Sequence, residues 1–308
     1  MPTNQDTGKT PGQLLRSAAR RFLRRPPANP MEQERLTPRP KPAPAPPDPN
    51  AAKFEEFFRT LPLSEEARGY MNVHLPRLVR TMTLVPEPQG AKRVLELGAY
   101  MQMTPALQEI CGYSEVRAAD FGKLGERVHK VVPLARGTFT VDVDLFDAEF
   151  DRFPYPDGYF SLILCCEMLE HLISDPIRML GEIRRCLEPG GRLLLSTPNC
   201  ASLASIASAL EGIANPQIFA KYSIGKPEDR PHVREYTAVE VGMLLKAAGF
   251  EVEQLLTDRI VWHDELAWVR ELLAANHFNG DLRGEQTYCI ARMESHLPVE
   301  RYPKWLYE

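Results

Sequence analysis

From residue 92 to the C-terminus, short apolar runs alternate with segments whose apolar residues recur at helical spacing. Seven of these runs have the length and the β-branched or aliphatic content of strands. They cover residues 93–97, 115–120, 139–144, 159–166, 192–197, 250–255 and 287–292. Because most of these strands are apolar on both faces and alternate with helices, we expect a mostly parallel seven-stranded sheet with helices on both faces.

Local signals place the helices between these strands. Asp175 is expected to cap a helix that begins at Pro176, and Thr237 to Glu240 has the pattern of a capping box. Asn50 and Ser64 are the expected caps of two helices that precede the first strand. A surface helix is expected over residues 264–275, with the alternative that it covers the ligand pocket.

The first 50 residues differ in composition from the rest of the chain. They hold twelve of the 28 prolines and carry a net charge of +5, whereas residues 51–308 carry −9. We therefore predict a disordered, Pro-rich basic tail over 1–50 and one folded domain over 51–308. Within that domain, 51–90 would form N-terminal helices, 91–257 the core, and 258–308 an insertion and the last strand. An acidic body excludes a nucleic-acid backbone as a favourable partner.

Acidic residues follow the first three strands of the predicted core. Glu96 and Gly98 end the first strand, and Asp120 ends the second, 22 residues after Gly98. That interval is typical of a carboxylate that accepts hydrogen bonds from the ribose of an adenosine-containing ligand. Asp144 and Asp147 follow the third strand, where a carboxylate can accept from an adenine amino group. The pattern predicts a Rossmann-like α/β fold with its ligand at the carboxyl edge of the sheet.

Four segments in this order resemble the motifs of class I S-adenosylmethionine-dependent methyltransferases. They are VLELGAYMQ, RAADFG, DAEFDRFPYPDGYFSLILCCEMLEHL and LEPGGRLLLSTPN, and the resemblance runs from about residue 90 to 255. CCEMLEHL looks most like the quinone-ring O-methyltransferases. STPN, HVREYT and RYPKWLYE look more like methyltransferases of bacterial polysaccharide gene clusters.

The resemblance implies S-adenosyl-L-methionine as cofactor and assigns residues to it. Residues after the first strand would enclose the methionine part, and Asp120 and Phe121 would hold the ribose and adenine. Asp147, or failing that Asp144, would reach the adenine edge, and Cys166 with Glu167 would form the floor. The cofactor positions are Glu96, Gly98, Tyr100, Asp120, Phe121, Asp147, Cys166 and Glu167.

The first loop departs from the family pattern. Tyr100 and Gln102 stand where the family places glycines, which serve tight turns and close backbone approach to a ligand. If these side chains fill the cofactor cleft, the chain is a non-catalytic methyltransferase-like binding module. That is the alternative to an enzyme.

A histidine lies where the methyl group would be transferred. Glu167, Glu170 and His171 are spaced i, i+3 and i+4, which predicts one face of a helix after the fourth strand. His171 is the expected general base for a hydroxyl acceptor. Two alternatives remain: a structural pairing of His171 with Glu170, and a divalent cation held by all three residues, as the similar quinone-ring enzymes suggest. We predict no dedicated metal site, because no fourth ligand is evident.

Arg234 and Tyr236 lie in the segment expected to form the acceptor side of the pocket. They can hydrogen-bond a polyhydroxylated or anionic acceptor, or they can serve only as the entry to the next helix. The predicted function is O-methylation of a small-molecule or sugar-linked hydroxyl. A quinone-like ring is the competing acceptor, and an apolar pocket beyond His171 would favour it.

The expected location is the bacterial cytoplasm, on the family resemblance and because no signal-peptide core or apolar span appears. Residues 13–25 are amphipathic at helical spacing, with arginines on one side. They are a candidate peripheral contact with the anionic inner membrane face, and a solvated tail is the alternative.

Overall fold

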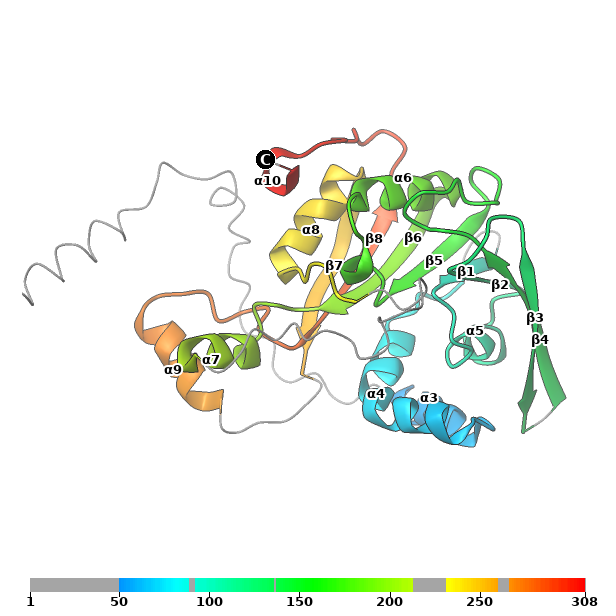
Figure 1. The fold of residues 1–308 in the computed structure, drawn as a ribbon, viewed down its shortest axis with the longest axis horizontal. Coiled ribbons are helices and arrows are strands. Elements are labelled where there is room, and N and C mark those ends of the chain that lie inside the picture. The colour runs from blue at the N-terminus through cyan, green and yellow to red at the C-terminus, as the bar shows by residue number, and fades with distance from the viewer. Residues whose placement is uncertain (1–49, 89–91, 136, 213–230, 260–265, 308) are drawn as a thin grey trace, which may run out of the picture. The chain divides into compact units, whose positions relative to one another are not determined.

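An eight-stranded, mostly parallel sheet forms the centre of the protein in a computed structural model, which describes residues 50–88, 92–135, 137–212, 231–259 and 266–307. The strands follow the order β3-β4-β2-β1-β5-β6-β8-β7 across the sheet (Figure 1). They are β1 (Arg93–Leu97), β2 (Glu115–Asp120), β3 (Arg127–Leu134), β4 (Gly137–Leu145), β5 (Phe160–Cys166), β6 (Leu187–Pro198), β7 (Phe250–Asp258) and β8 (Gln286–Met293).

Helices cover both faces of this sheet, as the sequence predicts. In the described ranges the helices are α3 (Ala51–Thr60), α4 (Glu65–Thr83), α5 (Thr104–Glu109), the 3₁₀ turn η1 (Leu169–His171), α6 (Pro176–Cys186), α7 (Leu203–Glu211), α8 (Ala238–Ala247), α9 (Ala267–Ala275) and α10 (Lys304–Tyr307). Side chains of α6 and α8 belong to one buried cluster, and those of α3, α4 and α5 belong to a second.

Alternation along the central strands divides the core between these two clusters. In β5, Ile163 and Cys165 pack with α6 and α8, while Leu162 and Leu164 pack with α3, α4 and α5. Successive side chains of a strand point to opposite faces, so a strand that is apolar throughout must be covered on both sides. The apolar run of β5 therefore explains why the domain has three layers.

The expectation of seven strands is wrong by one. Residues 127–134 form β3, which pairs antiparallel with β4 at the edge of the sheet. Of its eight residues only Val132 is buried. An exposed edge strand needs no apolar face, so its sequence lacks the alternation by which a half-buried strand is recognised.

Three of the four expected helix caps form in the structure. Ser64 accepts from the Ala67 amide, Asp175 accepts from the Arg178 amide, and Thr237 and Glu240 form the capping box. These three predictions are confirmed. Asn50 precedes α3 without a side-chain capping hydrogen bond, so that prediction is wrong.

Two further expectations concern segments outside the sheet. The insertion forms α9, whose Val269 and Leu273 pack against Leu203 and Ala207 of α7, and the two helices lie side by side (Figure 1). The proposed membrane contact of residues 13–25 lies outside the described residues. Within the described ranges, every helix is too short or too polar to cross a bilayer.

Candidate active site

The order of the strands reverses between β1 and β5, which run side by side and parallel. In sheets of this kind ligands bind beyond the carboxyl ends of the strands, at the point of reversal. Gly98 follows β1 at this edge, Asp120 ends β2, and Cys166 ends β5. The fold therefore brings together residues that lie up to 68 positions apart in the chain.

Glu96 lies inside the protein beneath this edge. Its side chain is buried, and its carboxyl accepts a hydrogen bond of 2.5 Å from the Thr104 hydroxyl at the start of α5. Burial raises the pKa of Glu96 to about 7, against a lowering by the Thr104 hydrogen bond. Glu96 thus links β1 to α5 and holds a carboxyl that titrates near neutral pH.

Gly98 needs to be a glycine. Its φ is +65°, and a Cβ there would lie 3.2 Å from the Met168 sulfur. A side chain would therefore be strained and would press on the segment that follows β5.

The two unusual residues of this loop point in different directions. Tyr100 is 72% exposed, and its ring centroid lies 6.4 Å from that of Tyr70 on α4. Gln102 is buried, with 7% of its surface exposed. Tyr100 therefore extends outward toward α4, whereas Gln102 packs inside the loop.

Asp120 is positioned by its own turn. Its carboxylate accepts from the Phe121 amide at 2.8 Å, and burial raises its pKa. Gly122 continues the turn, and a Cβ there would lie only 2.9 Å from the Leu145 side chain. Phe121 remains 37% exposed, so a planar ring can pack on it. These residues fit the ribose and adenine of the cofactor that the sequence motifs imply.

Of the two carboxylates after the third predicted strand, Asp144 is used structurally. It is buried and binds the Arg117 and Arg127 guanidinium groups at 3.0 and 2.5 Å and the Tyr155 hydroxyl at 2.9 Å. Asp147 accepts from the Glu149 amide at 2.9 Å in a half-exposed turn. Asp147 is thus the better placed of the two for an adenine edge.

The helix expected to carry Glu167, Glu170 and His171 on one face does not form. Glu167 has a left-handed backbone with φ of +54°, and only the 3₁₀ turn η1 follows. The Glu167 carboxylate pairs with Arg77 of α4, and it accepts from Ser196 at 2.8 Å and Gln286 at 2.6 Å. Because the backbone turns at Glu167, its side chain faces α4 and β8 rather than sharing a helix face with His171.

Glu170 and His171 instead meet a second histidine. The His171 and His232 rings pack edge to face with centroids 4.8 Å apart, and each Nε2 lies 4.0 Å from Glu170 Oε1. Burial, and then the charge of Glu167, raises the pKa of Glu170 well above its usual range. The ligand atoms of these three residues lie within 4.8 Å of one another. They can share a proton, or hold a cation with His232 in the place expected for Glu167.

Arg234 and Tyr236 turn out to support α8. Arg234 binds Glu240 of the capping box at 3.0 Å and lies over the Tyr236 ring, 5.0 Å from its centroid. Tyr236 is buried in the same core cluster as Val241. Their expected contact with an acceptor stays a prediction. Cys166 ends β5, and burial raises the pKa of its thiol to about 12, so the thiol stays protonated.

The sequence analysis missed the residues that α4 and β8 contribute. Arg77 and Gln286 bind Glu167, although they lie far from it in sequence. No local motif signals them. An arginine in an amphipathic helix and a polar residue at the start of a strand are common without any functional role.

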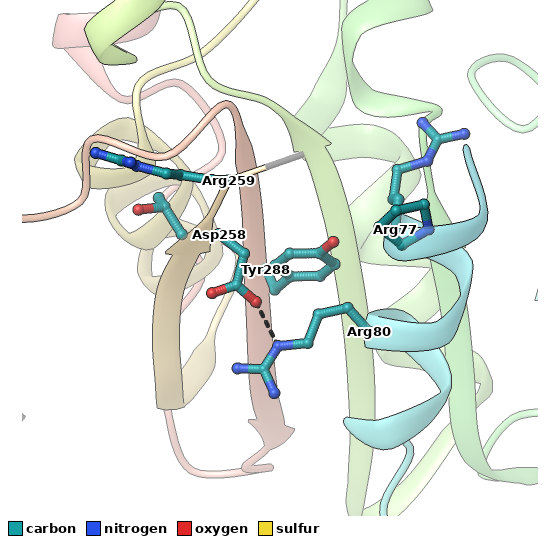
Figure 2. A pocket seen from close by; sticks show the side chains of 7 residues that line it. Arg77, Arg80, Asp258, Arg259 and Tyr288 are labelled. Atoms are coloured by element: carbon teal, nitrogen blue, oxygen red, sulfur yellow. Dashed lines mark hydrogen bonds and ion pairs between the residues drawn. The ribbon is translucent and has the colours of Figure 1, made fainter. Parts of the chain in front are cut away.

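Beside Glu167 lies a cavity of about 430 Å³ between α4, the end of β7 and β8 (Figure 2). Its lining consists of Pro76, Arg77, Arg80, Thr257, Asp258, Arg259 and Tyr288. Arg77 connects it to the centre of the site, because the same guanidinium pairs with Glu167. The lining of this cavity therefore includes three guanidinium groups beside apolar surface.

Strand order, the turn at Gly98 and the acidic strand ends define a nucleotide-cofactor-binding α/β protein of the class I methyltransferase type. Residues 68–255, more than half of the chain, match the methyltransferase domain family. The chain belongs to this family, which implies S-adenosyl-L-methionine as cofactor and confirms the fold class and family expected from the sequence.

Curated relatives have related names. A probable S-adenosylmethionine-dependent methyltransferase of Mycolicibacterium smegmatis is 32% identical over 116 residues, which span 37% of each chain. A ubiquinone biosynthesis O-methyltransferase of Pseudomonas aeruginosa is 28% identical over 167 residues, 54% of this chain and 68% of that one. This chain thus matches little more than a third of the mycobacterial protein.

Solved structures of methyltransferases resemble the chain at low sequence identity. One from Mesorhizobium loti is 18% identical with a TM-score of 0.43, and covers 71% of this chain and 97% of that chain. One from Archaeoglobus fulgidus is 17% identical with a TM-score of 0.45, and covers 74% and 100%. Likeness at this level says nothing about a substrate.

Proposed function

We propose that this chain is an S-adenosylmethionine-dependent O-methyltransferase whose acceptor is a polar hydroxyl compound, a small molecule or a sugar-linked one. The observation that carries the proposal is that Gly98, at the strand reversal, lies against Met168, which directly precedes the turn that bears His171, while Asp120 ends the adjacent strand β2. Family membership supplies the cofactor. The three arginines that line the cavity beside Glu167 support the class of acceptor.

In this proposal the edge formed by β1, β2 and β4 holds the cofactor. Asp120 accepts from the ribose hydroxyls, Phe121 packs on the adenine, and Asp147 accepts from its amino group. Gly98 lets the loop after β1 approach the methionine part, with Tyr100 at its outer side. When bound, the cofactor supplies a methyl group on a sulfonium, which makes displacement chiefly a matter of alignment.

His171 takes the proton that the acceptor hydroxyl loses as its oxygen gains the methyl group. The buried Glu170 carboxyl lies 4.0 Å from the His171 Nε2. His232 packs on the His171 ring and limits its rotation. Glu167, tied to Arg77, Ser196 and Gln286, fixes the end of β5 on the other side of the site.

Two acceptor classes compete, and the arginines of the cavity are the observation that supports the polar one. The Pseudomonas relative is named for ubiquinone biosynthesis, which supports a quinone-like ring as the acceptor. The cavity beside Glu167, however, has Pro76 as its one apolar residue among three arginines, an aspartate, a threonine and a tyrosine. Burying an isoprenoid against these groups would remove water from charges without replacing its hydrogen bonds. A glycan precursor as the acceptor and a cytoplasmic location remain predictions.

A non-catalytic binding module remains the second candidate. One observation supports it and another supports the enzyme. Gln102 is buried where the family has glycine, which favours an altered cofactor loop. Tyr100 extends outward, so the bulkier of the two substitutions leaves the loop's inner side open.

Calorimetric titration of S-adenosylmethionine and S-adenosylhomocysteine into the purified protein separates these candidates. We expect micromolar binding that Asp120→Ala weakens at least about tenfold, the loss for a charged hydrogen-bond acceptor. Asp142→Ala is the matched control, because Asp142 lies on β4, is half exposed and pairs with His129. Binding weaker than millimolar, or equal loss in both variants, contradicts the cofactor site.

Acceptors are then screened by the S-adenosylhomocysteine they release, with sugars and sugar phosphates before quinones. His171→Gln should reduce kcat by about 10²–10⁴-fold and leave S-adenosylhomocysteine affinity unchanged. His296→Gln is the control, since His296 is exposed and lies after β8. Unchanged turnover in His171→Gln would remove His171 as the base.

A further inference from the structure

The cavity beside Glu167 is lined by a tyrosine hydroxyl that the proposed methyl transfer does not use. Tyr288 on β8 is 1% exposed and lines the cavity. Figure 2 shows its ring between Asp258 on one side and α4 on the other. The Tyr288 hydroxyl is a hydrogen-bond donor on the cavity wall. Burial raises the pKa of Tyr288, so the hydroxyl stays protonated and can donate to a ligand.

The walls on either side of Tyr288 carry arginines. Arg77 and Arg80 come from α4, and Arg259 follows β7 (Figure 2). Arg80 pairs with Asp258 across the cavity, and both side chains are about one-third exposed, at 35% and 38%. This pair is therefore open enough for Arg80 to exchange Asp258 for a ligand.

Among the described residues around this cavity, guanidinium groups outnumber carboxylates. Arg270 on α9 has its pKa lowered by burial and then by the positive charge of Arg259, while Glu285 acts in the opposite direction. In the described ranges, the four guanidinium groups of this region thus meet three carboxylates, those of Glu167, Asp258 and Glu285. Guanidinium groups placed in this way can bind an anion.

The end of β7 is held in place by packing. A Cβ on Gly284 would collide with the Asp258 backbone, and the Gly284 amide donates to the Thr257 hydroxyl at 3.0 Å. The positions of Asp258 and Arg259 are therefore set by the neighbouring chain. The cavity wall is a built feature of the fold.

We propose that this cavity binds an anionic group of the acceptor, a phosphate or a carboxylate, which accepts from the Tyr288 hydroxyl and the Arg80 guanidinium. The inference rests on the proposed methyltransferase function, which it deepens by naming the acceptor's charge. Arg77 separates the anion from Glu167, so the anionic end of the acceptor lies on the α4 side and its reacting hydroxyl toward β5. Guanidinium groups recognise phosphate and carboxylate with paired hydrogen bonds, which suits this lining.

Calorimetry on the full chain with three separate probes tests the proposal: inorganic phosphate, glucuronate and dihexanoylphosphatidate. We expect at least one to bind, and Tyr288→Phe and Arg80→Gln each to weaken it about tenfold or more. The controls are Tyr302→Phe and Arg59→Gln, which change exposed side chains of the same types and should stay within about twofold. The probe that binds identifies phosphate, carboxylate or lipid-borne phosphate as the source.

S-adenosylhomocysteine is titrated into every variant, which shows that each is folded and separates two kinds of failure. If S-adenosylhomocysteine binds and none of the anions does, or if all variants bind anions equally, the anion site is refuted and the methyltransferase proposal stands. If S-adenosylhomocysteine fails to bind the unmodified chain, the proposed function is refuted. Anion binding that Tyr288→Phe still abolishes would then support the cavity by itself.

Discussion

Glu96 shows how a single buried carboxyl makes folding depend on pH. Its pKa is raised from 4.5 to about 7 by burial. Between these two values the folded state holds a proton that the unfolded state has released. The stabilisation is therefore complete below pH 4.5 and is lost as the pH rises through about 7.

Glu96→Gln should remove this pH dependence. A glutamine amide has no proton to lose in this pH range. From pH 4.5 to 7.5 the free energy of unfolding of the parent should therefore fall by about 3 kcal/mol relative to that of the variant. Urea denaturation at several pH values measures it. Glu109→Gln, at an exposed position of α5, is the control and should run parallel to the parent. A parallel curve for Glu96→Gln as well would contradict the raised pKa.

Replacement by alanine should change the free energy of unfolding in opposite directions at two glycines. Gly98→Ala should destabilise by about 1–3 kcal/mol, because its φ is +65° and the new methyl group meets Met168. It should also weaken S-adenosylhomocysteine binding. Gly69 lies in α4 with no atom near its Cβ position, so Gly69→Ala should stabilise by about 0.5–1 kcal/mol. Thermal and urea denaturation of both variants check the signs, and destabilisation by Gly69→Ala would count against this account of the backbone.

At the scale of elements, α4 is joined to the end of β5 by one ion pair. Arg77 is 9% exposed and Glu167 18%, so both charges are largely removed from water. Such a pair contributes little net stability, but removal of one partner leaves the other charge buried. The N-terminal helices are therefore tied to the chemistry of the sheet edge through a contact that only their packing creates.

Arg77→Met should cost about 3 kcal/mol in the free energy of unfolding, since Glu167 would keep only Ser196 and Gln286 as partners. Arg59→Met removes an exposed pair with Glu55 one turn away on α3, and should cost less than about 0.5 kcal/mol. Urea denaturation of both variants gives the comparison. If Arg77→Met and Arg59→Met lowered the free energy of unfolding equally, the Arg77–Glu167 pair would be effectively solvated.

At the scale of the whole molecule, two buried clusters on opposite faces of one sheet hold the described residues together. These residues belong to a compact unit that begins at Asp48. Residues 51–308 carry a net charge of −9, and the first 50 residues carry +5. Attraction of the whole chain to an anionic surface should therefore depend on the first 50 residues.

A chain that begins at Asn50 should keep its melting temperature within about 2 °C and its S-adenosylhomocysteine affinity within about twofold, because the two clusters lie wholly within it. Binding to vesicles that contain phosphatidylserine, measured by cosedimentation, should fall to background compared with the full chain. Equal vesicle binding by the two chains would place the membrane contact on the acidic body instead.

The sequence by itself determined the layered α/β class, seven of the eight strands, the caps at Ser64, Asp175 and Thr237, and the strand-end positions Gly98 and Asp120. All of these depend on local periodicity or on a residue's position at the end of an element. Such signals survive in a one-dimensional pattern, because neighbours in sequence are also neighbours in the structure.

Only the tertiary structure decided which distant side chains meet. Glu167 leaves the predicted helix face because its backbone is left-handed, and it pairs with Arg77, 90 residues away. His232 takes the expected place of Glu167 beside Glu170, and Tyr288 comes to face Arg80 across a cavity. These meetings depend on strand order and on the packing of α4 against the sheet. The free energy that selects them comes from burial over the whole core, which no local window of sequence contains.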